Sequence, residues 1–170
     1  MHNLFNLPLG TPYKIDMRNI PKHLASVSLT VWVGSLWAIG YLAVPILFQV
    51  QTDRQLAGML AGRMFESLGY VGLVCGGYLL LYRCTVTGKH ILHDRLVQIV
   101  TVMLLITLAN HCYIQPLMAD MKSQALPLEV MQSTFAGQFK MWHGISSILY
   151  LIESLLGAWL VIRSFNFSSK

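Results

Sequence analysis

The feature that most constrains this chain is a long stretch without a single charged side chain, residues 24–50. As an α-helix rising 1.5 Å per residue, this stretch would be about 40 Å long. A helix of that length crosses the hydrocarbon core of a bilayer, roughly 30 Å thick, with room to tilt. The stretch therefore predicts a transmembrane helix and a chain that folds in lipid.

Three further apolar segments predict three more spans, at about residues 60–82, 96–119 and 141–162. Charged residues make up only 11% of the chain, whereas soluble domains have about 25%. Four spans with short loops use nearly all of the 170 residues. The sequence thus predicts one all-α membrane domain over residues 1–170, a polytopic four-helix bundle.

The second span is longer than its uncharged part, because residues 67–82 alone are short for a bilayer. Asp53 can cap a helix that begins near Arg54, and we expect the first half of this helix to lie at the membrane interface. Small residues four apart allow close helix packing. The predicted packing positions on this helix are Gly58, Gly62, Gly72 and Gly76.

The net charge of +5 is distributed unevenly over the loops. The N-terminal segment, the loop at residues 83–95 and the C-terminal tail together hold more Lys and Arg than the opposite side, which has Arg54, Arg63, Lys122 and Lys140. The positive-inside rule then predicts both termini in the cytoplasm. Anionic lipid headgroups, and not nucleic acid, are the expected partners of this charge.

Polar residues interrupt the third and fourth spans, and they must face the bundle interior. In the predicted orientation the outer half of the bundle encloses a polar pocket, because Pro45 and Pro116 also leave backbone carbonyls unpaired there. Two stripes at helical spacing are expected to face each other across this pocket. They contain Thr107, His111 and Gln115, with Asn110 beside them, and His143, Ser147, Tyr150, Ser154 and Gly157.

Glu153 lies about 15 Å into the fourth span and so near the bilayer centre. An ionised carboxylate is expensive at that depth. Two interpretations stay open: a protonated, hydrogen-bonded structural acid, or a functional group with a basic partner or a bound cation.

The two histidines of these spans have a second interpretation besides hydrogen-bonded packing. His111 and His143 are of the type that ligates haem iron or copper. Arg63 could pair with a haem propionate, and Met118 and Met121 could be soft copper ligands or ordinary packing residues. No phosphate loop, dinucleotide fingerprint, CxxC, HExxH or nucleophile elbow occurs, so a self-contained enzyme is not expected.

Several local motifs together resemble a known family. They are Trp32-Val33-Gly34-Ser35-Leu36-Trp37, Tyr41, Pro45-Ile46-Leu47-Phe48, Ala61-Gly62-Arg63-Met64-Phe65, Asn110, Pro116 and Phe139-Lys140-Met141-Trp142-His143-Gly144-Ile145-Ser146. The chain is similar to uncharacterised bacterial four-helix membrane proteins that resemble the vertebrate transmembrane protein associated with cisplatin resistance.

That family is distantly similar to the copper-resistance D proteins and to the membrane protoporphyrinogen oxidase that binds haem b. The resemblance implies a four-helix fold and favours haem or copper as a cofactor. The chain departs from the family at Tyr150, where the family has asparagine, and at Glu153, which is not part of the family pattern.

Three functional hypotheses follow. The first is a bacterial inner-membrane protein that acts as an accessory or scaffolding subunit of a larger membrane assembly and binds other membrane subunits or a second copy of itself. The second is a haem b- or copper-handling membrane protein that uses His143 and His111. The third is a small transporter that uses Glu153 as its protonatable group.

Overall fold

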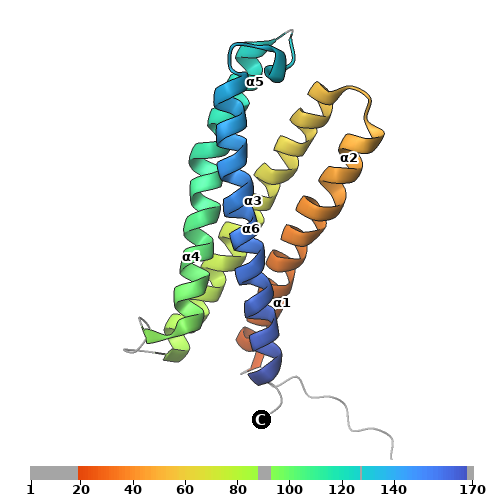
Figure 1. Ribbon diagram of the computed structural model, residues 1–170. Coiled ribbons are helices and arrows are strands. Elements are labelled where there is room, and N and C mark those ends of the chain that lie inside the picture. Colours follow the sequence, from red (N-terminus) through yellow and green to blue (C-terminus); the bar gives the residue numbers. More distant parts are fainter. Residues whose placement is uncertain (1–18, 88–92, 127, 168–170) are drawn as a thin grey trace, which may run out of the picture.

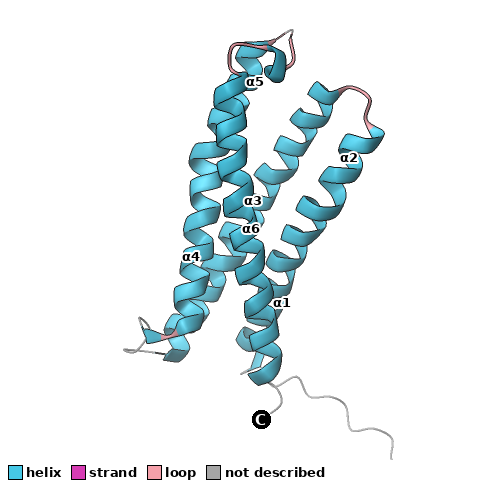
Figure 2. Cartoon of the chain, in the orientation of Figure 1, coloured by secondary structure: helices cyan, strands magenta, loops and turns pink. Residues whose placement is uncertain are grey.

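Four long helices form the molecule, and the second and fourth run without interruption (Figure 1). The computed structural model describes residues 19–87, 93–126 and 128–167. Every regular element in these ranges is helical (Figure 2). The elements are α1 (Ile20–Trp37), η2 (Ala38–Ala43), α2 (Val44–Val50), α3 (Arg54–Thr87), α4 (Arg95–Ala109), η4 (Asn110–Ile114), α5 (Gln115–Ala125), η5 (Val130–Gln132) and α6 (Ala136–Phe167).

The four helices are long and apolar enough to cross a membrane. The candidate spans are Ile20–Val50, Arg54–Thr87, Arg95–Ala125 and Ala136–Ser164, and each contains the corresponding predicted span. The prediction of an all-α, four-helix membrane bundle is confirmed. The protein is therefore a multi-pass integral membrane protein.

Side-chain caps determine where two of the helices begin. The Oδ1 atom of Asp53 accepts hydrogen bonds from the N–H groups of Gln55 and Leu56, at 2.9 and 3.0 Å. Asp94 accepts one from Leu96 N–H at 2.9 Å. These carboxylates satisfy N–H groups that the first turn of a helix leaves without intrahelical partners. The predicted start of the second helix at Asp53 is thus confirmed, which explains why α3 extends well before its uncharged part.

The core lies where α1, α3, α4 and α6 meet. Its fully enclosed side chains include Trp32 of α1 and Met103 of α4, both with no exposed surface. The glycines of α3 allow these helices to approach closely. A Cβ atom at Gly72 would stand 2.8 Å from Trp32 Nε1, and one at Gly76 would stand 2.6 Å from the Cδ2 atom of Leu104. Both positions therefore require glycine for this packing.

The first and third helices each contain a π-helical turn that ends two residues before a proline, Pro45 or Pro116. In η2 the N–H of Val44 bonds to the carbonyl of Ile39, five residues back, and η4 ends with the same type of bond. Proline has no N–H to continue the ladder, so the prediction of a disturbed helix at Pro45 follows from its chemistry. The form of the disturbance, a π turn, was not predicted.

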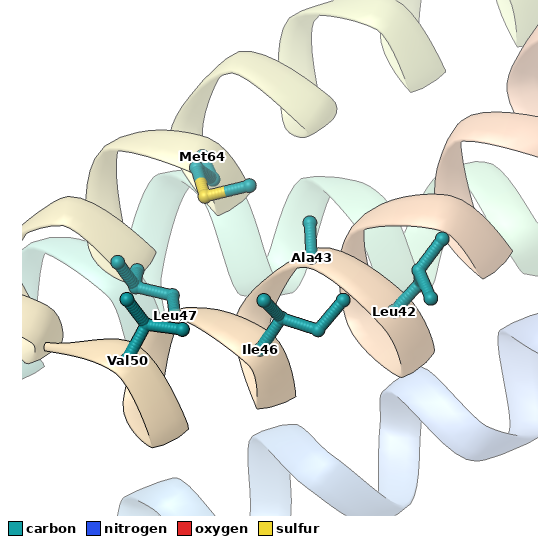
Figure 3. A pocket seen from close by; sticks show the side chains of 6 residues that line it. All are labelled: Leu42, Ala43, Ile46, Leu47, Val50 and Met64. Carbon is teal, nitrogen blue, oxygen red and sulfur yellow. The ribbon is translucent and has the colours of Figure 1, made fainter.

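At the end of the bundle that holds α2 and the start of α3, these two segments diverge from α5 and α6 (Figure 1). α2 packs mainly against α3, and neither η2 nor α2 contributes a buried residue. An apolar groove follows this half of the helix, as Figure 3 shows. Its walls are Leu42, Ala43, Ile46, Leu47 and Val50, together with Met64 of α3.

Candidate functional site

A buried carboxyl group lies at the meeting point of the four helices. Glu153 of α6 has only 3% of its surface exposed. Its Oε1 atom accepts a hydrogen bond of 2.7 Å from Thr107 Oγ1 of α4, and the indole N–H of Trp32 of α1 donates to the same carboxyl group. Gly72 of α3 lies against both donors, because a Cβ there would stand 2.8 Å from Trp32 Nε1 and 3.0 Å from Thr107 Cγ2. All four helices therefore enclose this acid.

The hydrogen bonds around Glu153 can accommodate the neutral form of the acid. The Thr107 hydroxyl lies within hydrogen-bonding distance of two acceptors, Glu153 Oε1 and the carbonyl of Met103 at 3.0 Å, but it has one proton. A protonated Glu153 would donate to Thr107 Oγ1, which could then donate to Met103. Every polar atom of the group would have a partner in that arrangement. The site thus suits a neutral acid in lipid.

Tyr150 inserts its hydroxyl group into the backbone of the first helix. The hydroxyl donates to the carbonyl of Leu36 and lies at the N–H of Gly40. A Cβ at Gly40 would stand 2.6 Å from the ring carbon Cζ of Tyr150, so glycine is required for this contact. The insertion occurs where α1 gives way to η2. Insertion of a side chain into the i→i−4 ladder is a recognised cause of local helix distortion.

The ring of Tyr150 also joins the first and second helices. Its centroid lies 5.5 Å from that of Phe65 and 6.0 Å from that of Tyr41. Sequence analysis placed Tyr150 in a polar stripe and missed its contact with the α1 backbone. The signal in the sequence that could have indicated this contact is Gly40, which precedes an aromatic residue and lies five residues before a proline.

The two predicted polar stripes meet only in part. Thr107 contacts Glu153, and Asn110 Oδ1 accepts a hydrogen bond of 2.8 Å from Ser146 Oγ. On α6 these contacts come from residues beside the stripe. Of the stripe itself Ser154 and Gly157 are buried, whereas His143 and Ser147 are exposed. The groove beside α2 is apolar and not the polar pocket that the sequence predicted.

The two histidines have different neighbours. His111 packs against α3, where a Cβ at Gly69 would stand 2.9 Å from its Cγ atom, and its ring centroid lies 4.5 Å from that of Tyr70. Its buried Nδ1 atom makes no hydrogen bond within the described part of the chain. His143 stacks on Phe139 of its own helix, with ring centroids 5.9 Å apart.

The other predicted ligand residues also lie in separate environments. Arg63 pairs with Glu66 at 2.9 Å on the exposed surface of α3. Met118 and Met121 are buried on α5, and Gln115 is half-buried. No cluster of three or more His, Cys, Asp or Glu side chains that could hold a metal ion occurs in residues 19–87, 93–126 and 128–167. The predicted ligands thus lie in separate environments, and haem or copper binding stays a prediction.

An ion pair joins the end of α3 to Asp94, which lies just before the third candidate span. The Arg83 guanidinium donates to Asp94 Oδ2, which also accepts a bond of 3.3 Å from Thr87 Oγ1. Partial burial works to raise the pKa of Asp94, but the hydrogen bonds from Arg83, Leu96 and Thr87 and the charge of Arg83 outweigh it. The pKa of Asp94 therefore lies below its usual value.

The fold and its buried acid define a class: multi-pass α-helical membrane proteins with a carboxyl group buried between the helices. Within this class, a family model described as a domain of unknown function (DUF4149) matches residues 27–127, more than half of the chain. The protein belongs to this family. The match begins within α1 and extends past the end of α5, whereas Tyr150 and Glu153 lie beyond it. No curated protein and no solved structure matches the chain.

Proposed function

We propose that this protein is an accessory or scaffolding subunit of a larger assembly in a bacterial inner membrane, with both termini in the cytoplasm. The observation that carries the proposal is the open half of the first helix. No residue of Ala38–Val50 is buried in the chain itself, although this segment lies within the part that matches the family model. Apart from Gly40 and Tyr41, which contact Tyr150, this half-helix packs little within the chain and offers its surface to a neighbouring membrane chain.

The chemistry of this surface suits helix packing in lipid. Leu42 is 60% exposed and Ile46 is 47% exposed, and both line the groove along α2 (Figure 3). Helices in a membrane associate through close van der Waals packing and not through exclusion of water. The groove lies at the end of the bundle that holds α2 and the start of α3, which we call the splayed end. Its apolar walls can pack against a neighbouring helix without a hydrogen bond or an ion pair.

The test is site-specific photo-crosslinking in the intact membrane. A photoreactive residue at position 46 should yield one discrete product with another protein, which also purifies with the chain at a fixed ratio in mild detergent. The same probe at Ile148 of α6, which is 61% exposed and lies outside the groove, is the matched control and should yield no discrete protein product. A monomer without a discrete product from position 46 would refute the proposal, and a crosslinked homodimer would replace it with self-association.

A second candidate function rests on Glu153. A carboxyl group enclosed by all four helices in the middle of a membrane is the arrangement expected of a proton-binding group in a small transporter. In proteoliposomes under an imposed pH gradient, we expect uptake of at least one substrate from a panel of labelled amino acids, sugars and divalent metal ions. Uptake should be lost in Glu153→Gln. Equal uptake by both proteins, or none by the wild type, would remove this candidate.

A further inference from the structure

Lys122 has a position that neither proposed function uses. Its side chain comes from α5, close to the end of the third span, and turns toward the interior of the splayed end. The Nζ atom donates to the carbonyl of Gly58 of α3 at 2.9 Å and lies 5.5 Å from the ring centroid of Phe139 of α6. Three helices thus hold one half-buried ammonium group between them.

This ammonium group has no carboxylate partner among the residues that the structure describes. The carboxylates nearest in sequence or on the facing helix are engaged elsewhere. Asp120 accepts from Gln124 at 2.7 Å, and Glu66 pairs with Arg63. An ammonium group has three N–H donors, and the Gly58 carbonyl accepts from one of them. The remaining two donors and the positive charge are therefore available to an anion.

There is space for an anion beside α3. A Cβ at Gly58 or Gly62 would find one atom within 4 Å in the described part of the chain, the Nζ atom of Lys122, at 3.9 Å in both cases. These glycines are one helical turn apart, so the space extends along the helix. The imidazole of His143 stacks on the Phe139 ring, the same ring that the ammonium group approaches.

We propose that Lys122 binds the phosphate group of an anionic phospholipid, which enters between α3 and α6 beside Gly58 and Gly62. A lysine that only extended to the membrane surface would direct its ammonium group outward, away from the bundle. Lys122 directs it inward to a backbone carbonyl and an aromatic ring. Basic groups held between transmembrane helices near the interface are suited to phosphate-containing headgroups.

The experiment measures lipid binding to the purified full-length chain by native mass spectrometry. The probes are phosphatidylglycerol, phosphatidylcholine with the same acyl chains, and soluble glycerol 3-phosphate. We expect phosphatidylglycerol to bind in preference to phosphatidylcholine, and Lys122→Met to weaken its binding about tenfold. Lys140→Met removes an exposed charge from the same end and should change binding less than about twofold.

A second pair of variants tests the space without removing the charge. Gly62→Leu fills the volume beside Lys122 and should also weaken binding about tenfold, since the phosphate must come within hydrogen-bonding distance. Gly77→Leu is the matched control on the same helix, because a Cβ there meets nothing within 4 Å. This pair decides the question if Lys122→Met does not fold.

Three results would overturn the assignment. In the first, Lys122→Met and Gly62→Leu bind phosphatidylglycerol as tightly as the wild type. In the second, phosphatidylcholine binds equally well. In the third, glycerol 3-phosphate binds as tightly as the lipid and depends equally on Lys122, which would identify a soluble phosphate compound as the ligand.

Discussion

Substitution of Gly40 by alanine should destabilise the protein through a single contact, that with Tyr150. The new Cβ would stand 2.6 Å from the ring carbon Cζ, so the ring must move and its hydroxyl must leave the carbonyl of Leu36. Overpacking costs about 1 to 3 kcal/mol, and a lost hydrogen bond costs about 1 kcal/mol. Alanine returns about 1 kcal/mol through its higher helix propensity. We expect a net loss of about 2 kcal/mol in the free energy of unfolding.

The assay is reversible unfolding in mixed micelles, followed by tryptophan fluorescence, with two controls. Gly34→Ala lies on the same helix, and its Cβ meets nothing within 4 Å, so it should be neutral or stabilising by up to about 1 kcal/mol. The second control repeats Gly40→Ala in a Tyr150→Ala background. There the destabilisation should vanish and the sign should reverse, because the clash is gone and the helix propensity remains.

The reasoning fails if Gly40→Ala is as stable as Gly34→Ala. It also fails if the cost of Gly40→Ala is the same with and without the Tyr150 ring. The second result would mean that position 40 is sensitive for a reason of its own backbone, and that Tyr150 does not determine the structure at this point of the first helix.

Three further predictions concern the remaining contacts. Because the ion pair with Arg83 lowers the pKa of Asp94, it stabilises the fold above the pKa of the unfolded state, and this contribution is lost as pH falls through the lower, folded pKa. Asp94→Asn keeps a helix cap and should flatten the fall in melting temperature below about pH 5; an unchanged fall would contradict this prediction. Gly72→Ala should lower the free energy of unfolding by about 1 to 3 kcal/mol, since its Cβ meets Trp32 Nε1 at 2.8 Å, whereas Gly77→Ala should not. Thr107→Val should cost about 1 to 3 kcal/mol in the same unfolding assay, because it removes the hydroxyl group that is hydrogen-bonded to a buried acid; a neutral result would mean that the Thr107–Glu153 bond contributes nothing net.

The spans could be predicted because lipid imposes one local requirement, a long apolar helix, which each segment satisfies by itself. Residues 24–50 carry that signal without any tertiary information. The cap at Asp53 was predictable for the same reason, since a short side chain bonds to N–H groups two and three residues further along the chain. Both features depend only on residues close together in the sequence.

The contacts of the candidate site depend on how the helices rotate and cross, which periodicity alone does not determine. Glu153 was predicted near the bilayer centre, but its donor Trp32 lies on a helix that carries no polar stripe. Lys122 was counted as a loop charge for topology, because a lysine near a span end ordinarily reaches the headgroups. Only the register of α5 against α3 brings its ammonium group to the Gly58 carbonyl.

The substitution Glu153→Gln separates the structural role of the acid from a functional one. The new side-chain amide can donate to Thr107 Oγ1 and accept from the Trp32 indole, the same pattern that a protonated Glu153 would have. If the acid is neutral in the folded protein, Glu153→Gln should change the free energy of unfolding by less than about 1 kcal/mol, whereas Glu153→Leu leaves Trp32 without an acceptor and should cost about 1 to 3 kcal/mol. A large loss in Glu153→Gln would show that the site requires the carboxylate or its bound cation. If Glu153→Gln is as stable as the wild type but no longer transports substrate, the proton of Glu153 is required for function. If Glu153→Gln is as stable as the wild type and binds its partner unchanged, Glu153 is a structural acid within an accessory subunit.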